Sequence, residues 1–404
     1  MPDNIAASGT ASRLTGRMAG RLSGRLDKLG FVIAMLAAGG LALPFATARA
    51  NRIVPGEARF LFDALPMATA FLLVAVVTAG LLVGLFSRRR LMRLVASLAS
   101  LAFLTVAIGL AASHLAPDGN SYARVSPASG FWLLLFASAL YVADSLVRLE
   151  VRSLLRLALL VAAALFLALL LSSGLWDDIS FMKEYRSRAD SFWNEAQRHI
   201  ALALGSLVAA TVAGIPLGLL CHRLPRLRAL VLNSLNIVQT IPSMALFGIL
   251  IAPLGWLAAQ FPLAASLGIR GIGAAPAFVA LFLYSLLPIV ANTVAGLAQV
   301  PDPVTDAARG MGMTRLQRLF RTEFPLAFPV ILTGIRIVMV QNIGLTTIAA
   351  LIGGGGFGTF VFQGIGQTAM DLVLLGALPT VLLAFAAAVI LDAAIEIAER
   401  GKTS

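Results

Sequence analysis

The chain has 404 residues, of which 59% are apolar and 12% are charged, and its mean hydropathy is +0.90. Because a soluble domain carries about 25% charged residues, this composition excludes the soluble classes and indicates an integral membrane protein. The net charge of +12 is explained better by membrane topology than by nucleic-acid binding, since the arginines form no extended basic stripe with aromatic residues between them.

Apolar runs long enough to cross about 30 Å of hydrocarbon recur along the chain. They lie near residues 30–48, 65–86, 94–112, 130–147, 154–174, 199–220, 229–252, 275–298, 326–350 and 372–394. The pattern predicts an all-α, polytopic membrane helical bundle with about ten transmembrane helices. Cys221 is the single cysteine, so disulfides within the chain and cysteine-based metal sites are excluded.

Basic residues set the predicted orientation of these spans. With the N-terminus inside, the inside segments carry 21 of the 31 lysines and arginines, the outside loops carry 9, and Arg336 lies within a span. The positive-inside rule therefore predicts that both termini are cytoplasmic. The stretch from Arg13 to Ala50 also mimics a cleavable signal peptide, but its apolar run is too long for one. We interpret it as an uncleaved first span; cleavage, the alternative, would leave the remaining topology unchanged.

The organisation of the chain changes near residue 175. Residues 1–29 are predicted to form a basic cytoplasmic tail, and residues 30–174 a membrane region of five helices with little polar content. Residues 175–198 suit a periplasmic linker or an amphipathic surface helix. From residue 199 to 398 the spans contain prolines, glycines and amides, so we expect the function to lie there, before a cytoplasmic tail at 399–404.

A polar, arginine-bearing segment at residues 301–325 separates two of the long apolar runs. Asp302 can accept hydrogen bonds from the free amides of a first helical turn, and Pro303 suits the first helical position. The sequence therefore predicts a short helix over residues 303–310, on the cytoplasmic side of the membrane.

A second helix is predicted in the same segment. Gly312 releases the chain from helical geometry, and Thr314 and Gln317 have the spacing of a capping box. We expect this helix to run through the following arginines and to end at Pro325. A long, capped cytoplasmic loop without a docking role is the plainer alternative.

The segment resembles the cytoplasmic EAA loop of permease subunits in bacterial ABC importers. The matching residues are Asp306-Ala307-Ala308, Gly312, Thr322 and Phe324-Pro325. Asp306, Thr322 and Phe324 depart from the usual Glu, Ile and Leu. Further stretches are similar to the glycine betaine, choline, carnitine and proline (osmoprotectant) branch of these importers, across residues 195–400: 203–218, 236–243, 284–289, 310–313 and 351–358.

The resemblance implies a MetI-like permease domain at residues 199–398, which forms the path for a small-molecule substrate across the bacterial inner membrane. It also implies ABC ATPase subunits, a second permease subunit that is identical or homologous, a periplasmic substrate-binding protein and membrane lipid as partners. Nucleic acid is not among them. The residues it assigns to ATPase coupling are Asp306, Ala307, Ala308, Arg309, Gly310, Gly312 and Pro325.

The chain is not expected to be an enzyme. Gly401-Lys402-Thr403 does not form a phosphate loop, because Glu396 stands where a further glycine is needed. The run Gly353 to Gly356 has no Lys-Ser/Thr pair and is interpreted as a flexible outer re-entrant or gate segment. We expect ATP and Mg to bind the partner ATPase, and no cofactor or metal to bind this chain.

Polar side chains within spans should face protein or water rather than lipid. Direct contact with substrate and hydrogen bonding between helices are equally open readings for them. Gly214 and Gly218 predict a close helix contact, and Arg336 needs a compensating group. Asp144 and Asp392 are interpreted as residues at the membrane interface. The candidates for the translocation path are Ser206, Gln239, Thr240, Ser243, Asn292, Gln341 and Asn342.

The sequence also bears on three other functions. A permease for another small polar solute, such as an amino acid, fits the same motifs. An ion-gradient secondary transporter would need an ionisable midplane site and usually related halves, whereas this chain has one deep charge and dissimilar halves. A membrane-embedded sensor or assembly protein would explain the first five spans but not the segment at 301–325.

Overall fold

The computed structural model describes residues 27–51, 54–87, 89–116 and 122–400. The chain divides into two compact units, one made of Met1–Val151 and Leu165–Lys183 and the other of Arg152–Ala164 and Glu184–Ser404. Most of the predicted basic tail and the Gly401-Lys402-Thr403 triplet lie outside the described residues.

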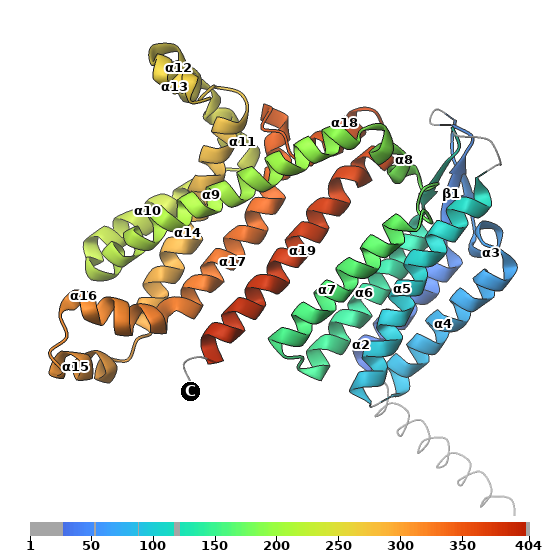
Figure 1. The fold of residues 1–404 in the computed structure, drawn as a ribbon, viewed down its shortest axis with the longest axis horizontal. Helices are drawn as coiled ribbons and strands as arrows, with labels where there is room; N and C mark the ends of the chain where they lie inside the picture. The colour runs from blue at the N-terminus through green and yellow to red at the C-terminus, as the bar shows by residue number, and fades with distance from the viewer. Residues whose placement is uncertain (1–26, 52–53, 88, 117–121, 401–404) are drawn as a thin grey trace, which may run out of the picture. The chain divides into compact units, whose positions relative to one another are not determined.

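The first unit is a helical bundle with a small antiparallel sheet (Figure 1). Its sheet has the order β2-β1-β3, with Ala46 opposite both Arg59 and Pro127. Glycines bring two of its helices close together, because a Cβ atom at Gly130 would lie 2.6 Å from the carbonyl oxygen of Gly40. The elements are α2 (Lys28–Ala42), β1 (Ala46–Arg49), β2 (Glu57–Arg59), α3 (Leu61–Ala64), α4 (Met67–Phe86), α5 (Arg90–Leu115), β3 (Arg124–Pro127), α6 (Ser129–Leu149) and the second half of α7 (Ser153–Ser172).

The second unit is wholly helical among its described residues (Figure 1). It follows α8 (Ser180–Ser187), which lies at the boundary of the two units. Its elements are residues 153–164 of α7, α9 (Ala189–Arg223), α10 (Pro225–Thr240), α11 (Ser243–Ile249), α12 (Ile251–Gln260), α13 (Pro262–Ser266), α14 (Ala274–Ala298), α15 (Asp302–Gly310), α16 (Arg315–Arg318), a π-helical turn (Leu319–Glu323), α17 (Phe324–Ala349), a 3-10 turn (Ala350–Ile352), α18 (Gly358–Gly366) and α19 (Met370–Arg400).

Helices α9, α14 and α17 form the centre of the second unit. A Cβ atom at Gly214 would lie 2.8 Å from Cγ2 of Ile289, and one at Gly218 would lie 2.6 Å from Cβ of Thr293. The close helix contact predicted for these two glycines is therefore confirmed. Around it lies an apolar core formed by Leu207, Ala210, Cys221, Leu235, Leu286, Ile289, Val290, Val294 and Val338.

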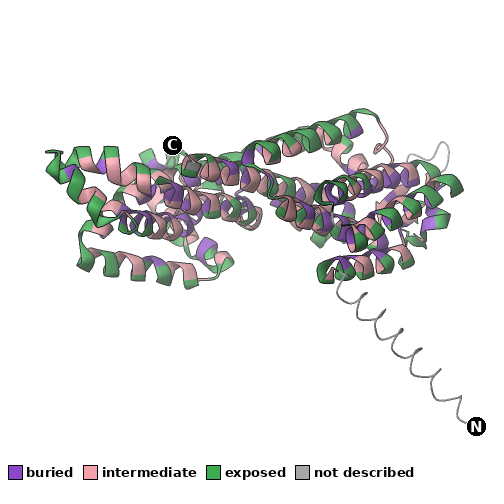
Figure 2. Ribbon diagram, turned by 90° about the horizontal axis from the view of Figure 1, so that it is seen from below, coloured by how far each residue is buried: buried purple, intermediate pink, exposed green. Residues whose placement is uncertain are grey.

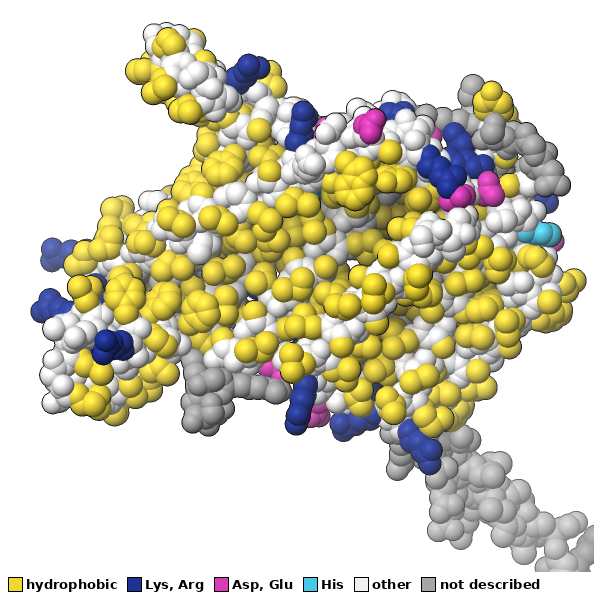
Figure 3. All heavy atoms as spheres, viewed as in Figure 1, with side chains coloured by type: hydrophobic (Ala, Val, Ile, Leu, Met, Phe, Trp, Pro, Cys, Tyr) yellow, Lys and Arg dark blue, Asp and Glu magenta, His cyan; other side chains and the backbone are white. Residues whose placement is uncertain are grey.

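The distribution of side chains suits a membrane setting. Figure 2 shows buried residues on the faces where helices meet and exposed residues on their outer faces. In each unit the visible surface is largely hydrophobic (Figure 3). Within the described residues, nine helices are long and apolar enough to cross a membrane, and α2 is a shorter apolar helix.

Two of the predicted spans were wrong in their limits, and proline explains both. The run at 30–48 is helical only to Ala42, because Leu43 precedes Pro44 and adopts the extended backbone that a following proline favours. The run at 229–252 breaks in the same way at Ile241, the residue before Pro242. Helix α11 begins only after that proline.

Candidate functional site

Helix α15 begins the polar segment at 301–325. It covers Asp302–Gly310, which confirms the predicted short helix. The predicted cap was wrong: the carbonyl of Pro301 accepts the first helical bond, from Val304 N at 3.0 Å, so Pro301 is the cap. Asp302 is the first helical residue and Pro303 the second.

The two alanines of the resemblance differ in their burial on α15. Ala308 is buried within the chain, whereas Ala307 and Gly310 are exposed. Asp306 and Arg309 are also exposed and form an ion pair of 3.1 Å along the helix. Such a surface pair stabilises a helix little, so this face is free to exchange partners.

The turn after α15 has the predicted geometry. Gly312 has φ +78°, in the left-handed region where residues with a Cβ atom are strained. A Cβ at this position would meet nothing within 4 Å, so glycine is required by the backbone rather than by space. The capping box is confirmed: Gln317 N donates to Thr314 Oγ1 at 3.3 Å, and Thr314 N donates to Gln317 Oε1 at 2.9 Å.

The second helix does not end at Pro325, and this prediction was wrong. Helix α16 passes through the π-helical turn directly into α17, in a continuous helix over Arg315–Ile352. In the π turn Phe324 N donates to the carbonyl of Leu319, five residues back. The wider turn accommodates the ring of Pro325, which lacks an N–H and would clash with a regular preceding turn.

Three large apolar side chains are exposed on this segment. Met311, Leu316 and Phe320 are 70%, 65% and 64% exposed. We call these three the apolar patch. Glu323, which the sequence reading did not single out, accepts from Arg318 Nε at 2.6 Å and so links the end of α16 to the end of the π turn.

Two of the path candidates meet in the centre of the second unit. Asn342 of α17 donates through Nδ2 to Ser206 Oγ at 3.0 Å, on α9, and to Ser285 Oγ at 2.9 Å, on α14. All three side chains are fully buried. Both serine hydroxyls also lie 2.6 Å from carbonyls of their own helices, Leu202 and Leu281. The cluster joins three helices, and Ser285 was missed because a serine on an apolar face has no distinctive spacing.

Gln239 lies beside the broken helix α10–α11. Its Nε2 donates to the carbonyl of Tyr284 at 2.9 Å, and the Tyr284 hydroxyl donates to the carbonyl of Ile241 at 2.6 Å. These two bonds tie the turn before Pro242 to helix α14.

The other path candidates lie on four helices, with Thr240 and Ser243 on either side of the turn at Ile241 and Pro242. Thr240 is exposed, and Ser243, Asn292 and Gln341 are partly exposed. Thr240 donates to the carbonyl of Ile237 at 2.7 Å, and Asn292 donates to that of Pro288 at 2.8 Å, each within its own helix.

The deep charge Arg336 has a partner. Its Nε lies 2.9 Å from Asp392 Oδ1 on α19, and each side chain is about a third exposed. This pairing supplies the compensating group that the sequence required without naming it.

The glycine-rich turn at 353–356 is packed rather than flexible. Gly354, Gly355 and Gly356 are buried, and Gly353, Gly355 and Gly356 have φ between +78° and +86°. Two side chains of α9 hold the turn. Glu195 Oε2 accepts from Gly356 N at 2.6 Å, and His199 Nδ1 accepts from Phe357 N at 3.3 Å.

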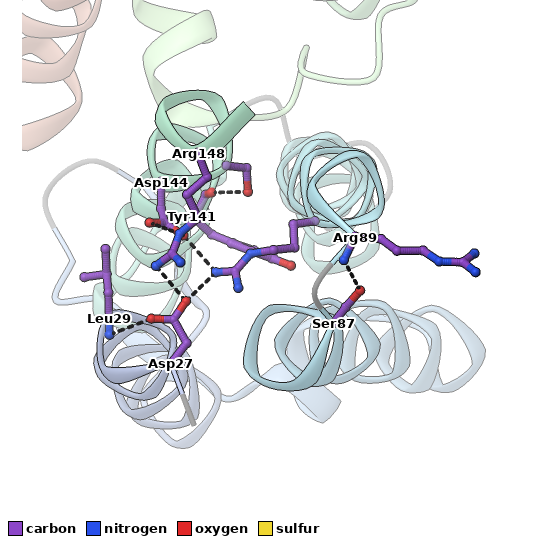
Figure 4. Close-up of polar contacts among 9 residues, drawn as sticks. Asp27, Leu29, Ser87, Arg89, Tyr141, Asp144 and Arg148 are labelled. Atoms are coloured by element: carbon purple, nitrogen blue, oxygen red, sulfur yellow. Dashed lines mark hydrogen bonds and ion pairs between the residues drawn. The ribbon is translucent and has the colours of Figure 1, made fainter. Parts of the chain in front are cut away.

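The first unit has an ionic cluster of its own. Asp27, Asp144 and Arg148 point toward one another (Figure 4), and Arg93 Nη2 donates to Asp27 and to Asp144 at 2.8 Å each. Arg148 pairs with the same two carboxylates, at 2.7 Å. Burial opposes ionisation of Asp27, but the hydrogen bond from Arg93 and the charges of Arg148 and Arg93 outweigh it and lower the pKa of this carboxyl. Asp144, expected at the membrane interface, is buried within this cluster.

Comparison with known proteins finds a family match in each part of the chain. Residues 27–182 match the family described as "ABC transporter permease YehY, N-terminal domain", and residues 210–404 match the family "Binding-protein-dependent transport system inner membrane component". Inward facing structures of the MetNI methionine ABC transporter cover 50% of this chain and 95% of theirs, with a TM-score of 0.42 and 21% identity.

Several curated relatives match about half of this chain. The osmoprotectant import permease OsmW of Salmonella typhimurium is 45% identical over 185 residues, which are 46% of this chain and 80% of that one. OsmY of the same organism is 41% identical over 46% and 74% of the two chains. The choline transport permease OpuBB of Bacillus subtilis is 34% identical over 51% and 85%. The chain therefore belongs to the family of osmoprotectant import permeases, multi-pass inner membrane components of binding-protein-dependent transport systems.

Proposed function

We propose that this chain is the permease subunit of an ATP-driven importer. It forms the path by which a quaternary ammonium or related osmoprotectant, such as glycine betaine, choline, carnitine or proline, crosses the inner membrane. The relatives support this solute class, because they are named for osmoprotectants, for choline, or for glycine betaine, carnitine and choline. ATP hydrolysis, with its ATP and Mg, belongs to separate ABC ATPase subunits, and this chain carries no cofactor or metal.

The apolar patch is the observation that carries the proposal. Met311, Leu316 and Phe320 lie on a short helical hairpin that the basic-residue count predicts to be cytoplasmic. Large apolar side chains grouped on a water-facing surface are typical of a protein docking site. Beside the patch, Asp306, Ala307 and Arg309 offer a polar edge and a small residue that permits close approach to a groove.

The bend at Gly312 gives the hairpin its shape. Its left-handed backbone turns α15 against the start of the continuous helix that leads into α17. We infer that a movement of the hairpin is transmitted along this helix. The capping box and the Arg318–Glu323 pair hold the start of the helix in a fixed conformation. The ATPase would thus move α17, and α17 carries Gln341 and Asn342.

For the path, we propose a division among the seven polar candidates. Ser206, Asn342 and Gln239 brace the helices through the bonds given above. The partly or fully exposed Thr240, Ser243, Asn292 and Gln341 have room for contact with solute or with the second permease subunit. That second subunit, identical or homologous, and a periplasmic substrate-binding protein complete the importer. Both termini are cytoplasmic, and the first unit accompanies the permease domain at 199–398 as a separate membrane domain.

Co-purification with the ATPase tests the proposal. We expect the tagged wild-type chain, co-expressed with its ATPase, to retain the ATPase through purification, and the double variant Leu316→Ser, Phe320→Ser to lose it while still inserting into the membrane. Val147→Ser in the first unit is the matched control, because Val147 is also exposed, at 76%. Retention of the ATPase by the double variant would reject the apolar patch as the docking site.

A further inference from the structure

A cleft of about 730 Å³ opens at the end of the second unit that the basic-residue count predicts to face outside. Its walls come from the start of α9, the start of α14, the segment around α12 and α13, and the glycine-rich turn. They include Arg198, Leu254, Leu267, Phe278 and Gly354. The volume lies within the range of about 300 to 1,000 Å³ that is typical of small-molecule sites.

Arg198 is the one charged residue among the residues that line this cleft. Its side chain is 63% exposed, and within the described residues its recorded ionic partner is Glu195, at 3.4 Å. A guanidinium has five N–H donors in a planar fork. A single contact of this length therefore leaves most of the fork open.

Glu195 is committed mainly to the glycine-rich turn rather than to Arg198. Its Oε2 accepts from Gly356 N at 2.6 Å and from Thr359 Oγ1 at 3.4 Å. Only Oε1 approaches Arg198. Glu195 thus orients the guanidinium of Arg198 but leaves most of its N–H donors without a bond to Glu195.

Gly355 makes room for this arrangement. A Cβ atom there would lie 2.8 Å from Glu195 Oε2 and 2.9 Å from Arg198 Cδ. The Arg198 stem therefore lies across a turn that has no side chain at this point. Any residue larger than glycine at 355 would push the arginine away, in addition to straining a backbone with φ +79°.

We propose that this cleft binds the carboxylate of a zwitterionic solute through Arg198. The inference rests on the proposed transport function and names the chemical group that the outer cleft selects. Arg pairs with a carboxylate through two parallel N–H···O bonds, which a hydroxyl does not offer. The apolar wall, with the ring of Phe278, faces the N-methyl groups of the same solute. Glycine betaine and carnitine carry a carboxylate, whereas choline carries a hydroxyl.

Paired uptake measurements on the complete importer test this assignment. Labelled glycine betaine and labelled choline are supplied to the same proteoliposomes, with Arg198→Gln compared with wild type. We expect a rise in the KM for glycine betaine of about tenfold, and an unchanged KM for choline. Arg270→Gln is the matched control, because Arg270 is exposed on the same outer side but does not line the cleft.

Two further variants sharpen the result. Arg198→Lys keeps the charge but loses the fork, so its KM for glycine betaine should fall between those of wild type and Arg198→Gln. Gly355→Ala should reproduce the selective loss of glycine betaine uptake, because it displaces the arginine.

An equal loss of glycine betaine and choline uptake in Arg198→Gln would assign Arg198 to a structural or lipid-phosphate contact and would overturn the proposal. Unchanged uptake of both solutes in this variant would overturn it as well. Failure of the wild-type importer to carry either solute would instead overturn the proposed function, and the cleft assignment with it.

Discussion

The side-chain amide of Gln239 donates to the backbone carbonyl of Tyr284 across the interface of α10 and α14. Tyr284 lies four residues before Pro288, which stands inside α14 and has no N–H to offer that carbonyl. In a membrane no water replaces the missing donor, so an unpaired carbonyl costs several kcal/mol. Gln239 thus supplies from a neighbouring helix the bond that proline removes.

This relationship predicts that Gln239→Leu lowers the free energy of unfolding by about 1 to 3 kcal/mol, because the Tyr284 carbonyl is left unpaired. Thermal unfolding in detergent measures the change. In a Pro288→Ala background the helix regains its own N–H, and the same substitution should then cost much less. An equal cost in both backgrounds would contradict the proposed link between Gln239 and Pro288.

The buried cluster predicts a modest cost for losing its amide. In Asn342→Leu the hydroxyls of Ser206 and Ser285 keep their partners on Leu202 and Leu281, so we expect the free energy of unfolding to fall by only about 1 kcal/mol. Solute uptake should keep its KM. A raised KM with unchanged stability would instead place Asn342 on the translocation path.

The polar segment could be predicted from the sequence largely because its determinants are local. The capping box needs only Thr314 and Gln317, and the bend needs only a glycine, so both appear within a few residues of sequence. The error at Pro325 arose because a π turn relieves the proline clash, and nothing in the local pattern indicates that wider turn. The exposure of the apolar patch depends on how the hairpin packs, which no local pattern contains.

Side chains that pair between different helices could not be predicted from the sequence, for a different reason. Arg336 clearly needed a counter-charge, but its partner Asp392 lies on another helix, and only the packing of α17 on α19 brings the two together. The same holds for Ser285 with Asn342 and for Arg93 with Asp27. In the first unit, the sheet was missed because its strands have only three or four residues, and because β3 is far in the chain from β1, with which it pairs.

Gly312 and Gly310 offer a matched test of the bend. Both positions are open to a Cβ atom, but only Gly312 has a left-handed backbone. We expect Gly312→Ala to strain the bend by about 1 to 2 kcal/mol and to weaken ATPase co-purification and uptake together. Gly310→Ala, within helix α15, should leave both near the wild-type level. Equal behaviour of the two variants would show that the bend does not require the left-handed conformation.

Asp27 gives a pH dependence whose sign follows from its lowered pKa. A carboxyl with a lower pKa in the folded state stabilises the fold above its unfolded pKa, which is about 3.9, and loses that contribution as the pH falls through the folded value. We therefore expect Asp27→Asn to lower the free energy of unfolding by about 1.5 to 3 kcal/mol at pH 7, because Arg93 and Arg148 each lose an ionised partner.

The difference between Asp27→Asn and wild type should begin to shrink as the pH falls to about 4, where the unfolded carboxyl takes up a proton, and should be lost only as the pH falls through the lower folded pKa. Asp63→Asn is the control, since this acidic residue of α3 lies outside the cluster and is exposed. Urea unfolding in detergent between pH 3.5 and 7 measures both variants. A difference for Asp27→Asn that stays constant across this range would mean that its charge is not what holds α2 to the ends of α5 and α6, and that the carboxyl acts only as the cap that accepts from Leu29 N.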